Sequence, residues 1–373
     1  MILVIDVMNM LFRGKFSSNS RVLSTPEGFD ITATYGSLKI MIGLLRKLPL
    51  VTEVICCSDP IKSVNHDPDT DRYLGTWRKT YCPDYKANRN AVKHGQKQEG
   101  MRQSVYANAP YFRGLCQLLN IVWMEDPQFE ADDLLAWVAH YYKPETDMVI
   151  MSGDRDVFQL LRYPNVEIMY PVKSGYETLN RATFYQQSAM LVDKKAAEAG
   201  RPRHLEHDCW LPWRCMVGDL SDNIAGLPGC GKATGHDIIQ LGMQHTKSRH
   251  PIELFGAWKH ALTQTGPKIG KREARLIASQ DAPDLLARNH YLMHLDGRRA
   301  QNTNGFFGTA NPDAIEKWFR AVNFKSLLPG GGSEADYQMT LGSLQCLQSS
   351  QQTYISTRMA SSTSTTPTVE APA

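Results

Sequence analysis

Three short apolar runs, each followed by an aspartate, constrain the fold of this 373-residue chain more than any other feature. Continuous apolar runs of four to six residues are typical of strands that are buried on both faces of a parallel sheet. Segments with helical spacing separate the runs, so the sequence predicts an α/β fold with a central, mainly parallel sheet flanked by helices. The predicted strands that contain these runs span 1–5 before Asp6, 53–58 before Asp59 and 147–152 before Asp154.

The order of the remaining elements supports this fold. Apolar spacing predicts helices over 35–45, 104–119 and 130–142, with a further strand at 121–124. The carboxyl ends of parallel strands meet at one edge of a sheet, where active sites of such folds lie. Each aspartate alone could simply initiate a turn. Three in succession favour a shared site formed by Asp6, Asp59 and Asp154.

A cluster of carboxylates begins the helix that is expected at 130–142. Glu130, Asp132 and Asp133 stand within four residues. Acidic side chains each gain about 0.3–1 kcal/mol from the dipole in a first helical turn, so N-capping is the ordinary explanation. Three neighbouring carboxylates also repel one another, and together with the acids at the strand ends they favour a cation site. Hard oxygen ligands suit Mg²⁺ or Mn²⁺.

A basic segment lies between the second strand and the next helix. From Arg78 to Arg102 there are seven lysines and arginines against two acids, with Trp77, Tyr81 and Tyr85 nearby. A solvated loop is the default interpretation of such a composition. On the rim of an acidic metal site, however, the cations could hold phosphates while the tyrosines stack on bases.

Composition restricts the class of protein only broadly. A net charge of +3 does not by itself show a polyanionic partner, and no stretch resembles a membrane span or a signal peptide, so we expect a cytoplasmic protein without a membrane partner. The eight cysteines form no CxxC pair, which fits a reducing compartment. His204, His207, Cys209 and Cys215 are close enough to raise a zinc site, but their spacing matches no familiar finger and buried thiols are the preferred interpretation.

Taken in order, these segments make the chain similar to the 5′ nucleases, the family of flap endonucleases and 5′→3′ exonucleases, especially the bacteriophage members. The resemblance covers residues 1 to about 245. It implies a PIN-like 5′ nuclease fold, a helical arch above an acidic cleft and a helix-three-turn-helix DNA-binding element. The motifs that carry it are Asp6-Val-Met-Asn-Met-Leu-Phe-Arg13, Ser58-Asp59-Pro60, Trp77-Arg78, Tyr85-Lys-Ala-Asn-Arg89, Glu130-Ala-Asp132-Asp133, Gly153-Asp154-Arg-Asp156 and Gly218-Asp219-Leu-Ser-Asp222-Asn223.

The resemblance also implies domains. We expect a catalytic α/β nuclease domain at 1–185 with a basic arch at 78–102, followed by a helical DNA-binding region at 186–328. The helix-three-turn-helix is expected near 208–241, where glycines would let the backbone approach a phosphate. Residues 329–373 are rich in Ser, Thr, Gln and Pro and are expected to form a largely disordered tail.

The family pattern implies residue roles and cofactors. Two Mg²⁺ ions, or Mn²⁺ in their place, would support two-metal hydrolysis, and we consider a monovalent cation at the helix-three-turn-helix as an additional cofactor. The implied metal ligands are Asp6, Asp59, Glu130, Asp132, Asp133, Asp154, Asp156, Asp219 and Asp222. The implied catalytic residues are Lys86, Arg89, Asp6, Asp59 and Asp154. The implied DNA-binding residues are Arg13, Arg78, Tyr85, Lys86, Arg89, Gly226, Gly229, Gly231 and Lys232.

Tyr85 is expected to stack on an unpaired base, and Arg13 and Arg78 to orient substrate or acids. The chain departs from the family pattern at Ala233, where relatives often carry a lysine, and its own lysine, Lys232, stands one residue earlier. The segment 61–76 is longer than a minimal linker and has no assigned role.

The expected activity is hydrolysis of DNA phosphodiester bonds at 5′ ends, flaps, nicks or junctions during replication or repair, by a free-standing monomer. Two alternatives share the fold, an RNase H-type nuclease that removes primers from RNA–DNA hybrids and a PIN-like ribonuclease. A third is a structure-specific DNA-binding protein without catalysis. Accumulated carboxylates disfavour the third, because they would repel the phosphates of bound DNA.

Overall fold

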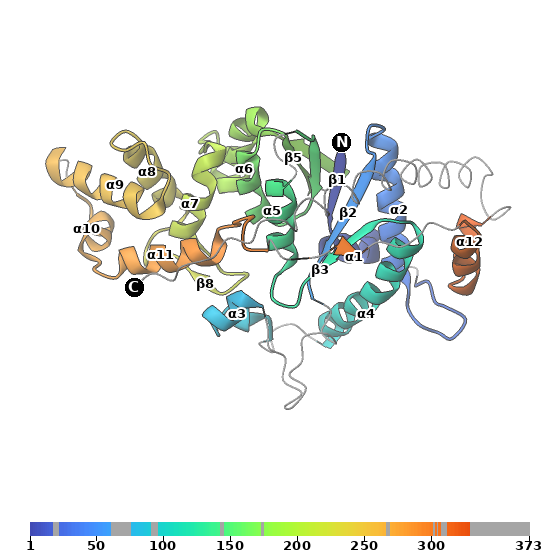
Figure 1. Ribbon diagram of the computed structural model, residues 1–373. Coiled ribbons are helices and arrows are strands. Elements are labelled where there is room, and N and C mark those ends of the chain that lie inside the picture. Colours follow the sequence, from blue (N-terminus) through green and yellow to red (C-terminus); the bar gives the residue numbers. More distant parts are fainter. Residues whose placement is uncertain are drawn as a thin grey trace, which may run out of the picture. The chain divides into compact units, whose positions relative to one another are not determined.

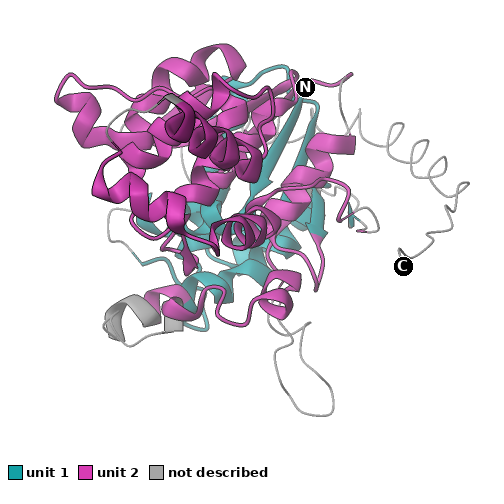
Figure 2. Ribbon diagram, turned by 90° about the vertical axis from the view of Figure 1, so that its left-hand side faces the viewer, with its two compact units in different colours: residues 1–56, 103–124, 305–373 teal, residues 57–102, 125–304 magenta. Residues whose placement is uncertain are grey.

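The computed structural model describes residues 1–17, 22–60, 76–90, 96–141, 145–172, 175–265, 269–300, 303, 305–306 and 312–328. The chain divides into two compact units, drawn in teal and magenta in Figure 2. The first unit comprises residues 1–56, 103–124 and those from 305 onward, and the second comprises 57–102 and 125–304.

The first unit is built on the strand order β1-β2-β3-β9. Strand β9 pairs antiparallel with β3, which places Trp123 opposite Phe306. Helices α1 and α2 approach closely at two glycines, because a Cβ on Gly36 would lie 2.1 Å from the carbonyl oxygen of Gly14. The elements are β1 (Ile2–Asp6), α1 (Val7–Ser17), α2 (Thr32–Lys47), β2 (Glu53–Ser58), most of α4 (Gln96–Leu118), β3 (Val122–Glu125), β9 (Gly305–Phe306), α12 (Pro312–Ala321) and the 3₁₀ helix η5 (Lys325–Leu327).

The second unit adds the strand order β6-β5-β4. Strands β4 (Met148–Met151) and β5 (Val166–Val172) are parallel, and β6 (Gly175–Leu179) returns antiparallel to β5. Helix α5 (Ala131–Tyr141) precedes β4, and the 3₁₀ helix η3 (Asp156–Arg162) follows it. All four residues of β4 are buried, as expected for an internal strand.

The rest of the second unit is mainly helical, and Figure 1 shows α7, α8, α9, α10 and α11 gathered together. Trp210 is fully buried against Phe158 and Phe184, which joins this region to η3 and α6. The elements are α3 (Trp77–Tyr81), η2 (Ala87–Asn90), α6 (Arg181–Glu198), η4 (His207–Cys209), α7 (Trp210–Val217), β7 (Gly218–Asp219), β8 (Ile224–Ala225), α8 (Lys232–Met243), α9 (Pro251–Thr265), α10 (Lys271–Ala278) and α11 (Ala282–Met293).

The predicted fold class is confirmed: the chain has a central, mainly parallel sheet flanked by helices and a helical C-terminal part. The predicted strands are found as β1, β2, β3 and β4 within one or two residues of their expected ends. Helix α1 and the β5–β6 hairpin were not predicted. The domain boundary near 185 stays a prediction, and the tail at 329–373 and most of the segment 61–76 lie outside the described residues.

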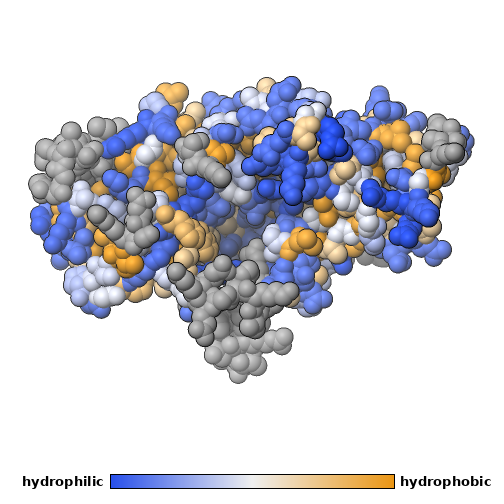
Figure 3. Space-filling view, turned by 180° about the vertical axis from the view of Figure 1, so that it is seen from behind, coloured by the Kyte–Doolittle hydropathy of each residue, from blue (hydrophilic) through white to orange (hydrophobic). Residues whose placement is uncertain are grey.

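On the face drawn in Figure 3, hydrophilic side chains predominate and the hydrophobic ones form separate groups. None of the described helices is long and apolar enough to cross a membrane.

Most cysteines of the described residues are buried free thiols, as expected, and Cys82 is partly exposed. The buried ones are Cys56, Cys57, Cys116, Cys209, Cys215 and Cys230.

Three histidines pack against one another at α9 and α11, and they predict a pH dependence of stability. The rings of His250 and His290 lie 4.6 Å apart, and those of His290 and His294 lie 5.0 Å apart. Burial, together with nearby positive charges such as His250 beside His290 and Arg162 beside His294, lowers the pKa of His290 and of His294 from 6.5 to about 4.

Unfolding would let both histidines take up protons near their ordinary pKa. The free energy of unfolding should therefore be largest above about pH 6.5 and should fall as the pH is lowered towards 4. Urea titrations at several pH values test this, and a His290→Gln/His294→Gln variant should lose that part of the dependence. A variant with the same pH profile as the original chain would contradict it.

Candidate active site

The predicted acids do follow the carboxyl ends of strands. In the first unit, Asp6 is the last residue of β1, only 7% exposed, and its Oδ1 accepts a hydrogen bond from the Asn9 amide at 3.0 Å. In the second unit, Asp59 comes directly after β2 and Asp154 comes three residues after β4. Asp59 Oδ1 accepts from the amide of Ala131, the first residue of α5, at 2.9 Å. This bond attaches the end of one strand to the acidic helix start.

The carboxylate of Asp133 is fully buried and is held by Arg78. The two Nη atoms of Arg78 donate to the two Asp133 oxygens at 2.6 and 2.8 Å, and Nη1 also donates to Glu130 at 3.2 Å. Burial lowers the pKa of Arg78, but the adjacent Asp133 and Glu130 raise it by more, so its net shift is upward and the guanidinium stays charged. Arg78 therefore orients acids, which is one of its two predicted roles.

Capping and site formation coexist at the start of α5. Asp133 accepts a hydrogen bond from the Glu130 amide at 3.2 Å, which is the capping role that the ordinary explanation assigned to these acids. Asp132, between them, lies in the first helical turn and is partly exposed. The indole of Trp77 donates to Asp133 at 3.0 Å. Three acids can therefore share this helix start, because the guanidinium of Arg78 neutralises the buried carboxylate of Asp133.

Glu130 is surrounded by donors from the basic segment. Lys86 Nζ donates to Glu130 Oε1 at 2.9 Å and lies 3.9 Å from Asp222. The Tyr85 hydroxyl lies 2.9 Å from Glu130 and 3.0 Å from Asp222. Burial would raise the pKa of Glu130, but Lys86 and Arg78 lower it to about 2, so this carboxylate is ionised at neutral pH.

The predicted stacking role of Tyr85 does not fit this arrangement. Its side chain is only 4% exposed, and its hydroxyl reaches the carboxylates of Glu130 and Asp222. Burial and the adjacent Glu130 raise the pKa of Tyr85, so the phenol stays protonated and acts as a donor. A ring enclosed in this way offers no open face to a base. The place of Tyr85 in the site stays a prediction, and its contacts suit a group that orients Glu130 and Asp222.

A second acidic pair is bridged by Arg214 of α7. Its Nε donates to Asp156 at 3.0 Å and its Nη2 to Asp219, whose other oxygen accepts from the amide and hydroxyl of Ser221. Burial raises the pKa of Asp156 to about 6 despite Arg214. Burial also favours a higher pKa for Asp219, but Arg214 and Ser221 lower it overall. The guanidinium thus holds two predicted metal ligands from separate segments.

Gly218 makes this second arrangement sterically feasible. It has a φ of +78°, and a Cβ there would lie 2.3 Å from the amide nitrogen of Gly226. This close approach allows β7 and β8 to form a short antiparallel pair, in which Asp219 lies opposite Ile224. The side chain of Asn289 donates to the carbonyl oxygens of Cys215 and Ala225, which fixes the pair to α7 and α11.

Carboxylate oxygens are the donors that Mg²⁺ and Mn²⁺ prefer, so the chemistry of these side chains fits divalent cations. Within the described residues, no three His, Cys, Asp or Glu side chains stand together as a ready metal cage. Most of the acids are instead held by the chain's own cations, Arg78, Lys86 and Arg214. Mg²⁺ commonly binds through one or two carboxylates plus water, and such a site needs no closed cage.

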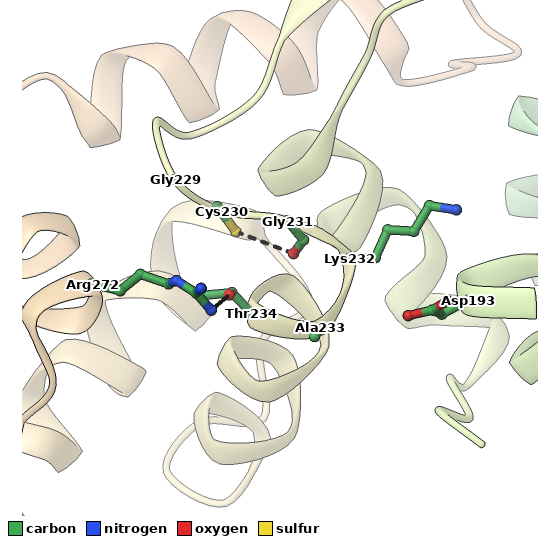
Figure 4. Close-up of a pocket in the computed structure, with 8 residues that line it drawn as sticks. All are labelled: Asp193, Gly229, Cys230, Gly231, Lys232, Ala233, Thr234 and Arg272. Carbon is green, nitrogen blue, oxygen red and sulfur yellow. Dashed lines mark hydrogen bonds between the residues drawn. The ribbon is translucent and has the colours of Figure 1, made fainter. Parts of the chain in front are cut away.

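The glycine-rich turn before α8 borders a hollow of about 540 Å³. Figure 4 shows its lining residues, with Arg272 of α10 hydrogen-bonded to Thr234 at 3.2 Å. Cβ atoms on Gly229 or Gly231 would meet no atom within 4 Å, so the backbone there is open to a ligand. At Gly226 a Cβ would lie 2.3 Å from the backbone of Val217, so that glycine serves chain packing.

Sequence reasoning missed several side chains that shape the site. Arg214 and Arg272 lie outside the motifs, and only their positive charge inside otherwise apolar or mixed helices could have drawn attention to them.

The remaining predicted DNA-binding side chains lie on separate helices. Arg13 lies in α1, which belongs to the first unit, as does Asp6. Arg89 lies in η2, and its side chain falls outside the described residues. Lys232 is the first residue of α8 and lines the hollow.

The residues considered for zinc have other partners. Cys209 is buried, with its sulfur 3.2 Å from that of Met243. The ring of His204 stacks on Tyr185, with centroids 4.9 Å apart, and Arg181 donates to His207 at 3.1 Å. The burial of Cys209 and Cys215 agrees with the preferred interpretation of buried thiols.

Comparison with known sequences gives a consistent relationship. The family model described as 5′-3′ exonuclease, N-terminal resolvase-like domain matches residues 1–189. A 5′-3′ exonuclease of Bacillus subtilis is 26% identical over 242 residues, covering 64% of this chain and 69% of the relative. A 5′-3′ exonuclease of Streptomyces coelicolor is 25% identical over 293 residues, covering 76% and 88%. The similarity to Thermus thermophilus DNA polymerase I covers only 24% of that enzyme.

Solved structures share the fold. The T5 5′-exonuclease with bound divalent metal ions (zinc) superposes with a TM-score of 0.55 at 18% identity, covering 93% of this chain and 99% of that one. A bacteriophage T5 flap endonuclease variant in complex with DNA and metal ions gives 0.54 at 18% identity, covering 93% and 98%. A bacteriophage origin of this chain stays a prediction, since the sequence relatives named above are bacterial. Because the family model spans half of its length, the chain belongs to the 5′-3′ exonuclease family.

Proposed function

We propose that this protein is a metal-dependent, structure-specific 5′ nuclease that hydrolyses DNA phosphodiester bonds at 5′ ends, flaps or junctions. The observation that carries the proposal is the joining of the basic segment to the acidic helix start, where Lys86 and Tyr85 reach both Glu130 and Asp222. This arrangement sets cations that can bind phosphate beside carboxylates that can bind metal. The family relationship supports the same activity.

The proposed metal-binding residues are the acids that sequence analysis identified. Asp59, Asp132 and Asp154 are partly exposed and are our first choices within the second unit. Four further acids would bind a metal ion through water, or directly once the ion replaces the lysine or arginine that now pairs with them. They are Glu130, Asp156, Asp219 and Asp222. Asp133 would act through Arg78, since its carboxylate is fully buried. Asp6 remains a proposed ligand from its position at the end of β1.

Two divalent ions, Mg²⁺ or Mn²⁺, would supply an activated water and stabilise charge on the leaving oxygen. The chain's own residues would do the rest. Lys86 and Arg89 would neutralise the scissile phosphate, and Arg78 would keep Glu130 and Asp133 in place. The open backbone at Gly229 and Gly231, with Lys232, would contact the phosphates of the duplex. A monovalent cation at this turn is a further proposal, as is a monomeric state.

Purified protein incubated with labelled DNA flaps, nicked duplex and RNA–DNA hybrids tests the activity, with and without Mg²⁺. We expect cleavage of the flap and nick substrates only with the metal. Preferred cleavage of hybrids would instead indicate the primer-removing alternative, and metal-dependent binding without cleavage would contradict the proposal.

Lys86→Ala should slow the chemical step on the order of a hundredfold, as does removal of one preorganised charge donor from other active sites. The ammonium is the only group that the substitution removes from Glu130, because Tyr85 and Arg78 retain their bonds. Single-turnover kinetics at saturating enzyme measures the step without interference from binding. Lys79→Ala provides a matched control, since Lys79 lies in the same segment and donates to the Tyr85 carbonyl. An unchanged single-turnover rate would remove Lys86 from the catalytic set.

A further inference from the structure

Two exposed tyrosines face each other where α3 meets α11. Tyr81, at the end of α3, is 51% exposed, and Tyr291 of α11 is 44% exposed. Their ring centroids are 4.5 Å apart with an interplanar angle of 50°. Both side chains are thus about half exposed, whereas that of Tyr85 in the same basic segment is enclosed. The pair therefore has the accessibility that base stacking requires.

A guanidinium lies over one ring of this pair. The Cζ of Arg299 is 4.7 Å from the ring centroid of Tyr291 and 4.4 Å from that of Trp77. Arg299 donates to the carbonyl oxygens of Tyr291 and His294, so neutral acceptors hold its positive charge in place. Aromatic faces combined with a cation are the elements of surfaces that bind single-stranded nucleic acid.

The pair is connected to the candidate active site by a short chain of contacts. The ring of Trp77 meets that of Tyr291 edge-on at 5.4 Å, and its indole donates to Asp133. The Nε of Arg78 donates to the carbonyl oxygen of Leu292, the residue after Tyr291. Both tyrosines are therefore anchored to the buried Arg78–Asp133 pair, and α3 lies beside the end of α11 (Figure 1).

We propose that Tyr81 and Tyr291, backed by Arg299, form a binding site for an unpaired base of single-stranded DNA. The inference rests on the proposed nuclease function and deepens it, because it assigns the unpaired strand of a flap or junction to a particular surface. A base would stack on the open tyrosine faces, while Arg299 strengthens the attraction through the ring of Tyr291. The contact is to the base, so it would tolerate any sequence.

The test measures binding in EDTA, so that no cleavage is needed. Fluorescence anisotropy compares a labelled oligothymidylate with an oligonucleotide of equal length and charge that carries abasic residues. We expect the wild-type chain to bind the oligothymidylate about tenfold more tightly, the size of effect that one stacked base gives. Tyr81→Ala and Tyr291→Ala should each remove most of this preference, and the corresponding Phe variants should keep it. Tyr185→Ala, which changes an exposed tyrosine stacked on His204, is the matched control.

The abasic comparison keeps the test independent of folding, because a disturbed variant would lose affinity for both oligonucleotides alike. An equal affinity of the wild-type chain for the two, or an unchanged preference in both Ala variants, would overturn the base-binding site. Loss of the preference in a protein that cuts no flap substrate with Mg²⁺ would support the site while refuting the nuclease. Cleavage of flaps by a wild-type chain that shows no preference for oligothymidylate would support the nuclease and refute the base-binding site.

Discussion

Replacing Asp154 with asparagine should lower the cleavage rate at least about a thousandfold, the equivalent of roughly 4 kcal/mol of lost transition-state stabilisation. Asp154 Oδ1 accepts the Asp156 amide at 2.8 Å, and an asparagine oxygen can accept the same bond. The turn after β4 should therefore persist while the negative charge that would bind a divalent ion is lost. Affinity for flap DNA in EDTA should change little, since the substitution removes a repulsive charge and no phosphate contact.

Single-turnover cleavage with Mg²⁺ and anisotropy without it separate the two effects. Asp147→Asn supplies the matched control, because Asp147 is an exposed aspartate directly before β4, at the opposite end of the same strand. That variant should cleave normally. Near-normal turnover by Asp154→Asn would exclude Asp154 from the metal site, and a parallel loss of DNA affinity would point to damage in the turn.

The sheet was predictable because burial dictates its sequence. The strands β1 and β4 are buried throughout, so their apolar runs are continuous. The aspartates at those ends could be grouped because parallel strands bring their carboxyl ends together. The β5–β6 hairpin was missed because its second strand is short and half exposed, with Glu177 and Thr178 on the surface, and resembles a loop in composition.

The partners of the acids were harder to predict than the acids. Arg214 directly follows Trp213 in the otherwise apolar helix α7, and its bonds to Asp156 and Asp219 depend on packing that sequence spacing does not show. Tyr85 could be assigned to the site from its motif, but its burial depends on how the basic segment packs against Glu130 and Asp222. A residue's neighbourhood follows from a motif, whereas the direction of its side chain follows from tertiary packing.

Truncating Arg78 should cost about 3–5 kcal/mol of the free energy of unfolding, the range found when one partner of a buried ion pair is removed. Arg78 is 3% exposed, and its loss would leave the fully buried Asp133 carboxylate with only the indole of Trp77 and the Glu130 amide among its described donors. The bond from Arg78 to the Leu292 carbonyl would be lost as well, which would remove one of the contacts between α3 and α11. Urea unfolding followed by tryptophan fluorescence should show a lower midpoint for Arg78→Ala.

Two further variants locate the origin of this cost. Arg320→Ala breaks an exposed pair with Glu316 in α12 and should cost at most about 0.5 kcal/mol, because solvent screens such pairs. Arg78→Lys keeps the charge but cannot bind both Asp133 oxygens with a planar fork, so its midpoint should lie between those of wild type and Arg78→Ala. If Arg78→Ala were no less stable than Arg320→Ala, the buried pair could not be what anchors the acidic helix start. An Arg78→Lys variant as unstable as Arg78→Ala would show that the two-oxygen geometry, and not the charge alone, holds Asp133 in place.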